Sequence, residues 1–146
     1  MNNGLRNVLV PVAPNRETEE AMDVACRLAA DRRASLVAVS VVEIPTLLPP
    51  DSHMLEEEAS AHRLLERAAA IADLYGVNVT TRILRGRVAA DAIVCEAEAR
   101  DVEIIVIGAP RHRRKAFGST VEGVLKKARC RVLLIGGGGA RQPVAA

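Results

Sequence analysis

The stretch GAPRHRRKAFGST, from Gly108 to Thr120, combines residue types that proteins use to hold a phosphate. Glycines stand at both ends, and the bases between them are Arg111, Arg113, Arg114 and Lys115. Gly118-Ser119-Thr120 precedes a predicted helix, and a helix N-terminus offers an anion free backbone N–H groups and a partial positive charge. We therefore predict a phosphate site in which Gly118, Ser119 and Thr120 are the fixed part and the bases are a mobile cover.

A simpler interpretation of this stretch is that Ser119 only caps the helix and that the bases form a solvated loop. The sequence contains no GxxxxGK[ST] phosphate loop. It also lacks the dinucleotide-binding turn, because the first predicted strand is followed by Ala13-Pro14-Asn15 and not by glycines. The loop residues alone leave both interpretations open, so the position of the loop in the fold matters.

The composition favours one globular domain without a nucleic-acid partner. The chain has 146 residues, 49% of them hydrophobic, and a net charge of +2, so it is long enough to bury a core. Its only aromatic residues are Tyr75 and Phe117, too few for stacking bases on aromatic rings. Cys26, Cys95 and Cys130 are odd in number and lack CxxC spacing, which predicts reduced thiols and a cytoplasmic location.

Apolar runs and helical stripes alternate along the chain. The predicted strands cover residues 7–12, 35–42, 77–84, 102–109 and 130–135. The predicted helices cover residues 17–32, about 51–75, a segment that begins near 89, and a segment around 121–128. Residues 1–135 thus form one predicted domain, and the glycine-rich residues 136–146 form a predicted flexible tail.

Local signals predict how some of these elements begin and end. Asn15 or Thr18 is the expected cap of the first helix, and Asp51 or Ser52 of the second. Residues 85–87, Arg-Gly-Arg, follow a predicted edge strand, and we interpret them as a turn with solvated arginines.

Five strands alternating with helices predict an α/β fold: a single five-stranded parallel sheet with helices on both faces, Rossmann-like. In such open sheets, ligands bind at the carboxyl ends of the strands where the winding reverses. We expect the strand order 3-2-1-4-5, and if the strands have this order, the reversal lies between the first and fourth strands. Residues 12–15 and residues 108–120 would meet there, which favours the phosphate interpretation.

Three groups of residues carry a resemblance to a known family. They are Val8-Leu9-Val10-Pro11-Val12 near the start, Ile107-Gly108 followed by Gly118-Ser119-Thr120, and Cys130–Ile135 near the end. From Asn7 to Ile135 the chain resembles a universal stress protein domain. Gly108-Ala109-Pro110-Arg111 and Leu84-Arg85-Gly86-Arg87 are most similar to such domains appended to amino-acid permeases. The resemblance implies an adenine nucleotide alpha hydrolase-like fold, a role in the stress response, and a homodimer paired through the strand Cys130–Ile135.

The resemblance also implies a site for an adenine nucleotide. Its expected residues are Pro11, Val12, Ala13, Val41, Ile107, Gly108, Arg111, Gly118, Ser119 and Thr120. ATP-binding members of the family have Gly-x-x-Gly, nine residues, and then Gly-Ser or Gly-Thr, with an aspartate that contacts the adenosine. This chain has Arg111 where the middle glycine belongs, a loop three residues shorter, and Ala13 in place of the aspartate. ATP, ADP and AMP are all candidate ligands.

Two functions stay open at this point. The first is a nucleotide-responsive binding protein, in which occupancy of the site alters a dimer or a downstream partner. The second is an interaction module without nucleotide, whose basic loop contacts a partner protein, a transporter or an anionic lipid head group. An ATP hydrolase is a third alternative, but no residues for Mg²⁺ ligation or water activation can be assigned. His53, His62 and His112 lack ligand spacing, so no metal site is predicted.

Overall fold

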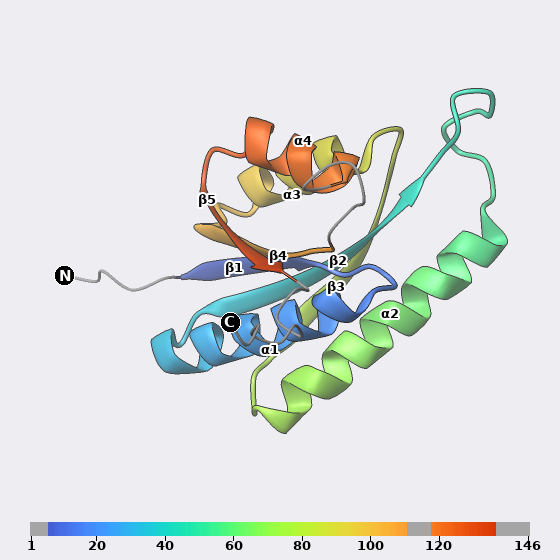
Figure 1. The fold of residues 1–146 in the computed structure, drawn as a ribbon. Helices are drawn as coiled ribbons and strands as arrows, with labels where there is room; N and C mark the ends of the chain where they lie inside the picture. Colours follow the sequence, from blue (N-terminus) through green and yellow to red (C-terminus); the bar gives the residue numbers. More distant parts are fainter. Residues whose placement is uncertain (1–5, 111–117, 137–146) are drawn as a thin grey trace, which may run out of the picture.

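The computed structural model describes residues 6–110 and 118–136, which form alternating strands and helices (Figure 1). The strands are β1 (Asn7–Pro11), β2 (Ser35–Glu43), β3 (Val79–Gly86), β4 (Ile104–Ala109) and β5 (Arg131–Gly136). The helices are α1 (Arg16–Arg32), α2 (Leu55–Leu74), α3 (Ala89–Ala99) and α4 (Ser119–Lys127). Within this part of the chain, no helix is long and apolar enough to cross a membrane. The tail predicted for residues 136–146 falls outside the described residues, apart from Gly136, which ends β5.

The five strands form one parallel sheet in the order β3-β2-β1-β4-β5, which confirms the predicted fold and strand order. In Figure 1, α1 and α2 cover one face of the sheet, and α3 and α4 cover the other. The predicted edge position of β3 is confirmed, and so is the central position of β4, all of whose residues are buried.

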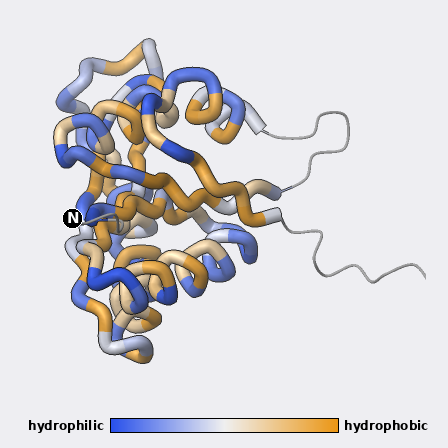
Figure 2. Tube along the Cα trace, turned by 90° about the vertical axis from the view of Figure 1, so that its left-hand side faces the viewer, coloured by the Kyte–Doolittle hydropathy of each residue, from blue (hydrophilic) through white to orange (hydrophobic). Residues whose placement is uncertain are grey.

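The core has two halves because successive side chains of a strand point to opposite faces of the sheet. In β1, Val8 and Val10 pack toward α1 and α2, whereas Leu9 packs toward α3 and α4. In β4, Val106 and Ile107 divide between the two halves in the same way. Figure 2 shows the strands as a mostly hydrophobic band between helices of mixed hydropathy. Burial on both faces explains why these strands are continuous apolar runs.

The sheet separates beside the carboxyl end of β1. Pairing of β1 with β2 continues to Pro11, opposite Val39, but pairing of β1 with β4 ends at Leu9, opposite Ile105. The N–H of Val12 donates to the carbonyl of Val39 in β2 (2.8 Å), so by alternation the backbone of Pro11 faces β4. Proline has no N–H to donate. The ladder between β1 and β4 therefore stops there, and a gap opens between the strand ends.

The start of α2 differs from the prediction that Asp51 or Ser52 caps it. The helix begins at Leu55, and its N-cap, Met54, makes no capping hydrogen bond through its side chain. The hydroxyl of Ser52 instead donates to the carbonyl of Pro49 (2.8 Å). Ser52 is therefore part of a turn that precedes the helix. The prediction for α1 is confirmed for Asn15, whose side-chain oxygen accepts from the N–H of Thr18 (2.9 Å).

Arg85 and Arg87 are exposed, as interpreted from the sequence, but Arg85 lies in β3 and not in a turn, and both arginines also donate hydrogen bonds. Gly86 is the last residue of β3 and pairs with Glu43. Arg85 donates to Glu58 and to the carbonyls of Pro50 and Ser52. Arg87 donates to the carbonyls of Ile44, Pro45 and Leu48, the last at 2.8 Å. Together they fasten the proline-containing loop between β2 and α2 to the end of β3.

We predict that Arg87→Met loosens this loop. The change removes charged hydrogen bonds to three carbonyls, and because the group is partly exposed the expected loss of unfolding free energy is about 1 kcal/mol. Limited proteolysis should cut within residues 44–54 faster than in the wild type. Arg63→Met, at an exposed arginine of α2, is the matched control. Equal cleavage of the two variants would show that Arg87 does not hold the loop.

Candidate functional site

A cavity of about 530 Å³ lies where β1 and β4 separate. Its walls come from the ends of β1, β2 and β4, from the segment between β1 and α1, and from the first turns of α3 and α4. The volume is in the usual range for small-molecule sites. Much of the floor is apolar and includes Val39, Val41, Ile93 and Ile107.

Nine of the ten predicted site residues line this cavity: Pro11, Val12, Ala13, Val41, Ile107, Gly108, Gly118, Ser119 and Thr120. They come from four separate parts of the chain, and the fold brings them together. The tenth, Arg111, lies outside the described residues, together with the other bases of the loop. The cavity therefore has the predicted position and lining, while the role of each residue in binding stays a prediction.

The N-terminus of α4 faces the cavity without a side-chain cap. Gly118 is the N-cap residue, and it has extended backbone angles (φ −78°, ψ 176°) and no side chain to accept a hydrogen bond. Ser119 is the first helical residue, so the interpretation of Ser119 as the cap is wrong. The first N–H groups of a helix have no partner within it. This end of the cavity therefore presents backbone donors and the hydroxyls of Ser119 and Thr120.

The segment between β1 and α1 uses its donors internally. The N–H of Ala13 donates to the hydroxyl of Thr18 (3.1 Å), and the N–H of Asn15 donates to the carbonyl of Ala13 (2.8 Å). Thr18, the second predicted cap, is thus inside α1 and braces Ala13 from there. These bonds constrain the turn, and the methyl side chain of Ala13 offers the cavity no hydrogen-bonding group.

Glu43, which no sequence motif indicates, also lines the cavity. It follows Val39 and Val41 at alternate positions of β2, so all three side chains point to the same face of the sheet. One carboxylate oxygen of Glu43 accepts from the N–H of Ala89 at the start of α3 (2.8 Å). Because side chains of a strand alternate between the two faces of the sheet, the residue two positions after Val41 could have been predicted to line the same cavity.

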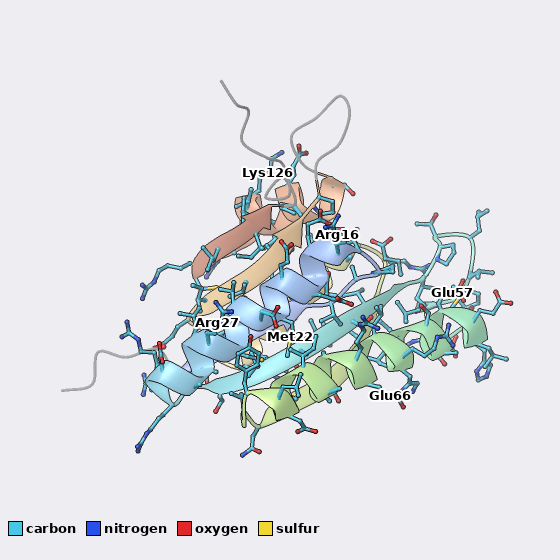
Figure 3. The ribbon with its side chains drawn as sticks, turned by 60° about the horizontal axis from the view of Figure 1, so that its bottom comes forward. Arg16, Met22, Arg27, Glu57, Glu66 and Lys126 are labelled. Atoms are coloured by element: carbon cyan, nitrogen blue, oxygen red, sulfur yellow. The ribbon has the colours of Figure 1, made fainter. Side chains whose placement is uncertain are left out.

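Glu57 of α2 also lines the cavity, and Figure 3 shows it near the start of that helix. No local pattern points to Glu57, because its position depends on where the loop before α2 places the helix. Two carboxylates thus lie toward the β2 side of the cavity, and the positive end of α4 lies on the other side. The cavity is therefore electrostatically polar along its length.

Gly108 has a packing reason to be glycine. A Cβ atom added to it would lie 2.7 Å from the backbone carbonyl carbon of Glu17 and 2.8 Å from the backbone nitrogen of Thr18. Both atoms belong to the first turn of α1, which cannot move away as a flexible side chain would. The missing side chain lets α1 lie directly on the end of β4, and this contact helps to shape the cavity.

We predict that Gly108→Ala destabilises the protein by about 1–3 kcal/mol, the usual cost of overpacking. Denaturant unfolding measures the change. Gly86→Ala is the matched control at another strand residue, because its Cβ would lie 3.6 Å from that of Ala92, an ordinary contact. If Gly108→Ala is as stable as Gly86→Ala, the close approach of α1 does not require a glycine.

The described residues contain few other side chains that could bind a metal or act as a nucleophile. Residues 6–110 and 118–136 contain no cluster of three or more metal-ligating side chains. Cys26 is buried, and this burial, with a smaller contribution from Asp23, raises the pKa of its thiol to about 11. Cys130 is partly buried, and the same cause raises its pKa, whereas Cys95 is exposed.

The open parallel sheet, with a cavity at the reversal of strand order, defines an α/β protein with a ligand cleft at its topological switch point. Residues 4–136 match the family model described as "Universal stress protein family". The chain therefore belongs to the universal stress protein family, as its sequence motifs predicted.

Solved structures with the same fold agree with this assignment. One is a universal stress protein from Archaeoglobus fulgidus, 23% identical, with a TM-score of 0.78 over 89% of this chain and 98% of that one. A universal stress protein from the same organism in complex with dAMP is 24% identical, with a TM-score of 0.74 over 89% and 97%. A universal stress protein in complex with cAMP is 18% identical, with a TM-score of 0.70 over 91% and 98%. A search among curated proteins gives no significant match.

Proposed function

We propose that the protein binds an adenine nucleotide in this cleft and acts in the cytoplasm as a nucleotide-responsive, dimeric regulator in the stress response. The observation that carries the proposal is the uncapped N-terminus of α4 at one end of a cavity whose floor is apolar. Phosphate groups suit the first feature, and a purine ring suits the second. The relatives in complex with dAMP and cAMP support the choice of an adenine nucleotide.

The polarity of the cleft favours one orientation of the nucleotide. Phosphates belong at Gly118, Ser119 and Thr120, where backbone donors face the cavity. The nucleoside then extends toward Val41 and the carboxylates of Glu43 and Glu57. Carboxylates accept hydrogen bonds, so they favour the amino and hydroxyl groups of a nucleoside and repel phosphate.

Ala13 weakens this binding relative to family members with an aspartate at its position. Its side chain forms no hydrogen bond, and its N–H is already donated to Thr18. The loss of a charge-assisted hydrogen bond costs about 1.5–3 kcal/mol, or roughly a ten- to hundred-fold loss in affinity. The loop is shorter and carries Arg111, so a nucleotide with fewer phosphates is as good a candidate as ATP.

We predict that Gly118→Val weakens nucleotide binding at least about ten-fold, because a side chain at the start of α4 would occupy the space of the phosphate. Calorimetric titration of ATP and AMP into the wild type and the variant measures the effect. Gly136→Val is the control, since a Cβ at Gly136 would meet nothing within 4 Å.

Equal binding by a folded Gly118→Val protein would place the nucleotide elsewhere. If the wild type binds neither nucleotide at millimolar concentration, the interaction module is the better account of the protein.

The proposed dimer forms through β5, the sheet edge next to β4. Its exposed and half-buried side chains include Val132, Leu133 and Leu134, and an apolar edge strand readily pairs with another copy. The N–H of Arg131 donates to Glu103 at the β4 side (3.3 Å). By alternation, the N–H of Val132 points outward, away from β4.

We predict that Val132→Pro converts the dimer to a monomer and leaves the fold intact, because it removes an outward donor and none of those facing β4. Light scattering at micromolar concentration gives the mass. Val132→Ala keeps the N–H and should remain dimeric. A monomeric wild type, or an unchanged mass in Val132→Pro, would contradict pairing through β5.

A further inference from the structure

A second cavity, of about 440 Å³, lies between α1 and α2 on the opposite face of the sheet from α3 and α4. It shares Val12, Ala13, Asn15 and Thr18 with the cleft described above. The segment from Val12 to Asn15 is therefore a common wall between the two cavities. Neither the sequence motifs nor the proposed nucleotide accounts for this second cavity.

The inner surface of the second cavity is apolar. Met22 of α1 and Ala68 of α2 are 1% and 3% exposed, and the half-buried side chains of Leu64 and Ile71 flank Ala68 on α2. Leu64, Ala68 and Ile71 follow helical spacing and form one stripe. Leu64 and Ile71 keep part of their apolar surface open to the cavity, whereas Met22 and Ala68 are almost fully buried. Figure 3 shows Met22 on the side of α1 that faces α2.

The opening of this cavity is charged. Arg16, Glu19 and Arg67 lie among its lining residues, and Arg67 forms an ion pair with Glu19 across the two helices. Arg16, at the start of α1 (Figure 3), makes no ion pair with any residue that the structure describes. The opening thus carries one positive charge beyond the neutral pair, above an apolar floor.

We propose that the cavity between α1 and α2 binds a small amphipathic carboxylate, with its apolar chain against Leu64 and Ile71 and its carboxylate at Arg16. An arginine guanidinium and a carboxylate form a charge-assisted pair, and the floor offers apolar surface that the chain would cover. Volume, apolar lining and a few polar groups at the opening are the usual properties of a small-molecule site. The proposal does not depend on nucleotide binding in the other cleft.

The common wall gives this site a way to act on the other cleft. Ala13 is held by its bond to Thr18, and Asn15 by the cap of α1. A carboxylate at Arg16 would lie next to Asn15 in the chain. Its binding should therefore perturb the amides of Ala13 and Asn15 as well as those of the cavity floor.

Titration of the full chain with decanoate, followed by amide NMR, tests the proposal. We expect saturable binding, with shift changes that centre on Leu64, Ile71 and the Val12–Asn15 wall. Arg16→Glu should weaken the binding about ten-fold, which is about 1.4 kcal/mol. Arg27→Glu reverses an exposed charge on the same helix outside the cavity and should leave it unchanged. Decylammonium should bind more weakly than decanoate.

Ala68→Phe should abolish the decanoate response by filling the cavity. If the Ala68→Phe protein does not fold, the comparison of Arg16→Glu with the wild type still decides the test. Decanoate binding that does not saturate would be surface adsorption and would overturn the proposal. So would equal affinities of Arg16→Glu and Arg27→Glu, or shift changes that spare α1 and α2.

Discussion

The position of Pro11 in β1 is the constraint on which the rest of the site depends. A central parallel strand normally bonds to both neighbours along its whole length, but proline has no N–H for the side that faces β4. Pairing with β4 stops at Leu9, while pairing with β2 continues to Pro11. The break coincides with the reversal of strand order, where crossovers already lead to opposite faces. A cavity forms there as a consequence of backbone chemistry.

Packing around this break gives the cavity its shape and charge. Gly108 lets α1 lie against the end of β4, and the internal bonds from Ala13 to Asn15 fix the turn between β1 and α1. The alternation of β2 brings Glu43 to the same side as Val41, while Gly118 leaves the start of α4 uncapped. Acceptors thus gather at one end of the cavity and donors at the other. This arrangement suits a ligand that has hydrogen-bond donors at one end and an anionic group at the other.

The sequence predicted most of the fold because local patterns carry it. The uniformly apolar β4 and the alternating polar and apolar residues of β3 already indicate a central and an edge strand, and the observed order agrees with both. The prediction for the start of α2 was wrong because Ser52, although serine often caps helices, forms a turn with Pro49 instead. The role of Arg87 could not be predicted, since its partner carbonyls lie 39 to 43 positions away. Nine predicted site residues meet at the cavity because they follow strand ends, whereas Glu57 depends on the placement of a whole helix.

Amide NMR of the wild-type protein during titration with AMP tests the central claim most directly. If the nucleotide lies in the cleft at the break between β1 and β4, shift changes saturate and gather at Ala13, Val41, Gly108 and Ser119, which belong to four different segments of the chain. An absence of shift changes at millimolar AMP would contradict the account. Changes confined to another surface, such as β5, would contradict it equally.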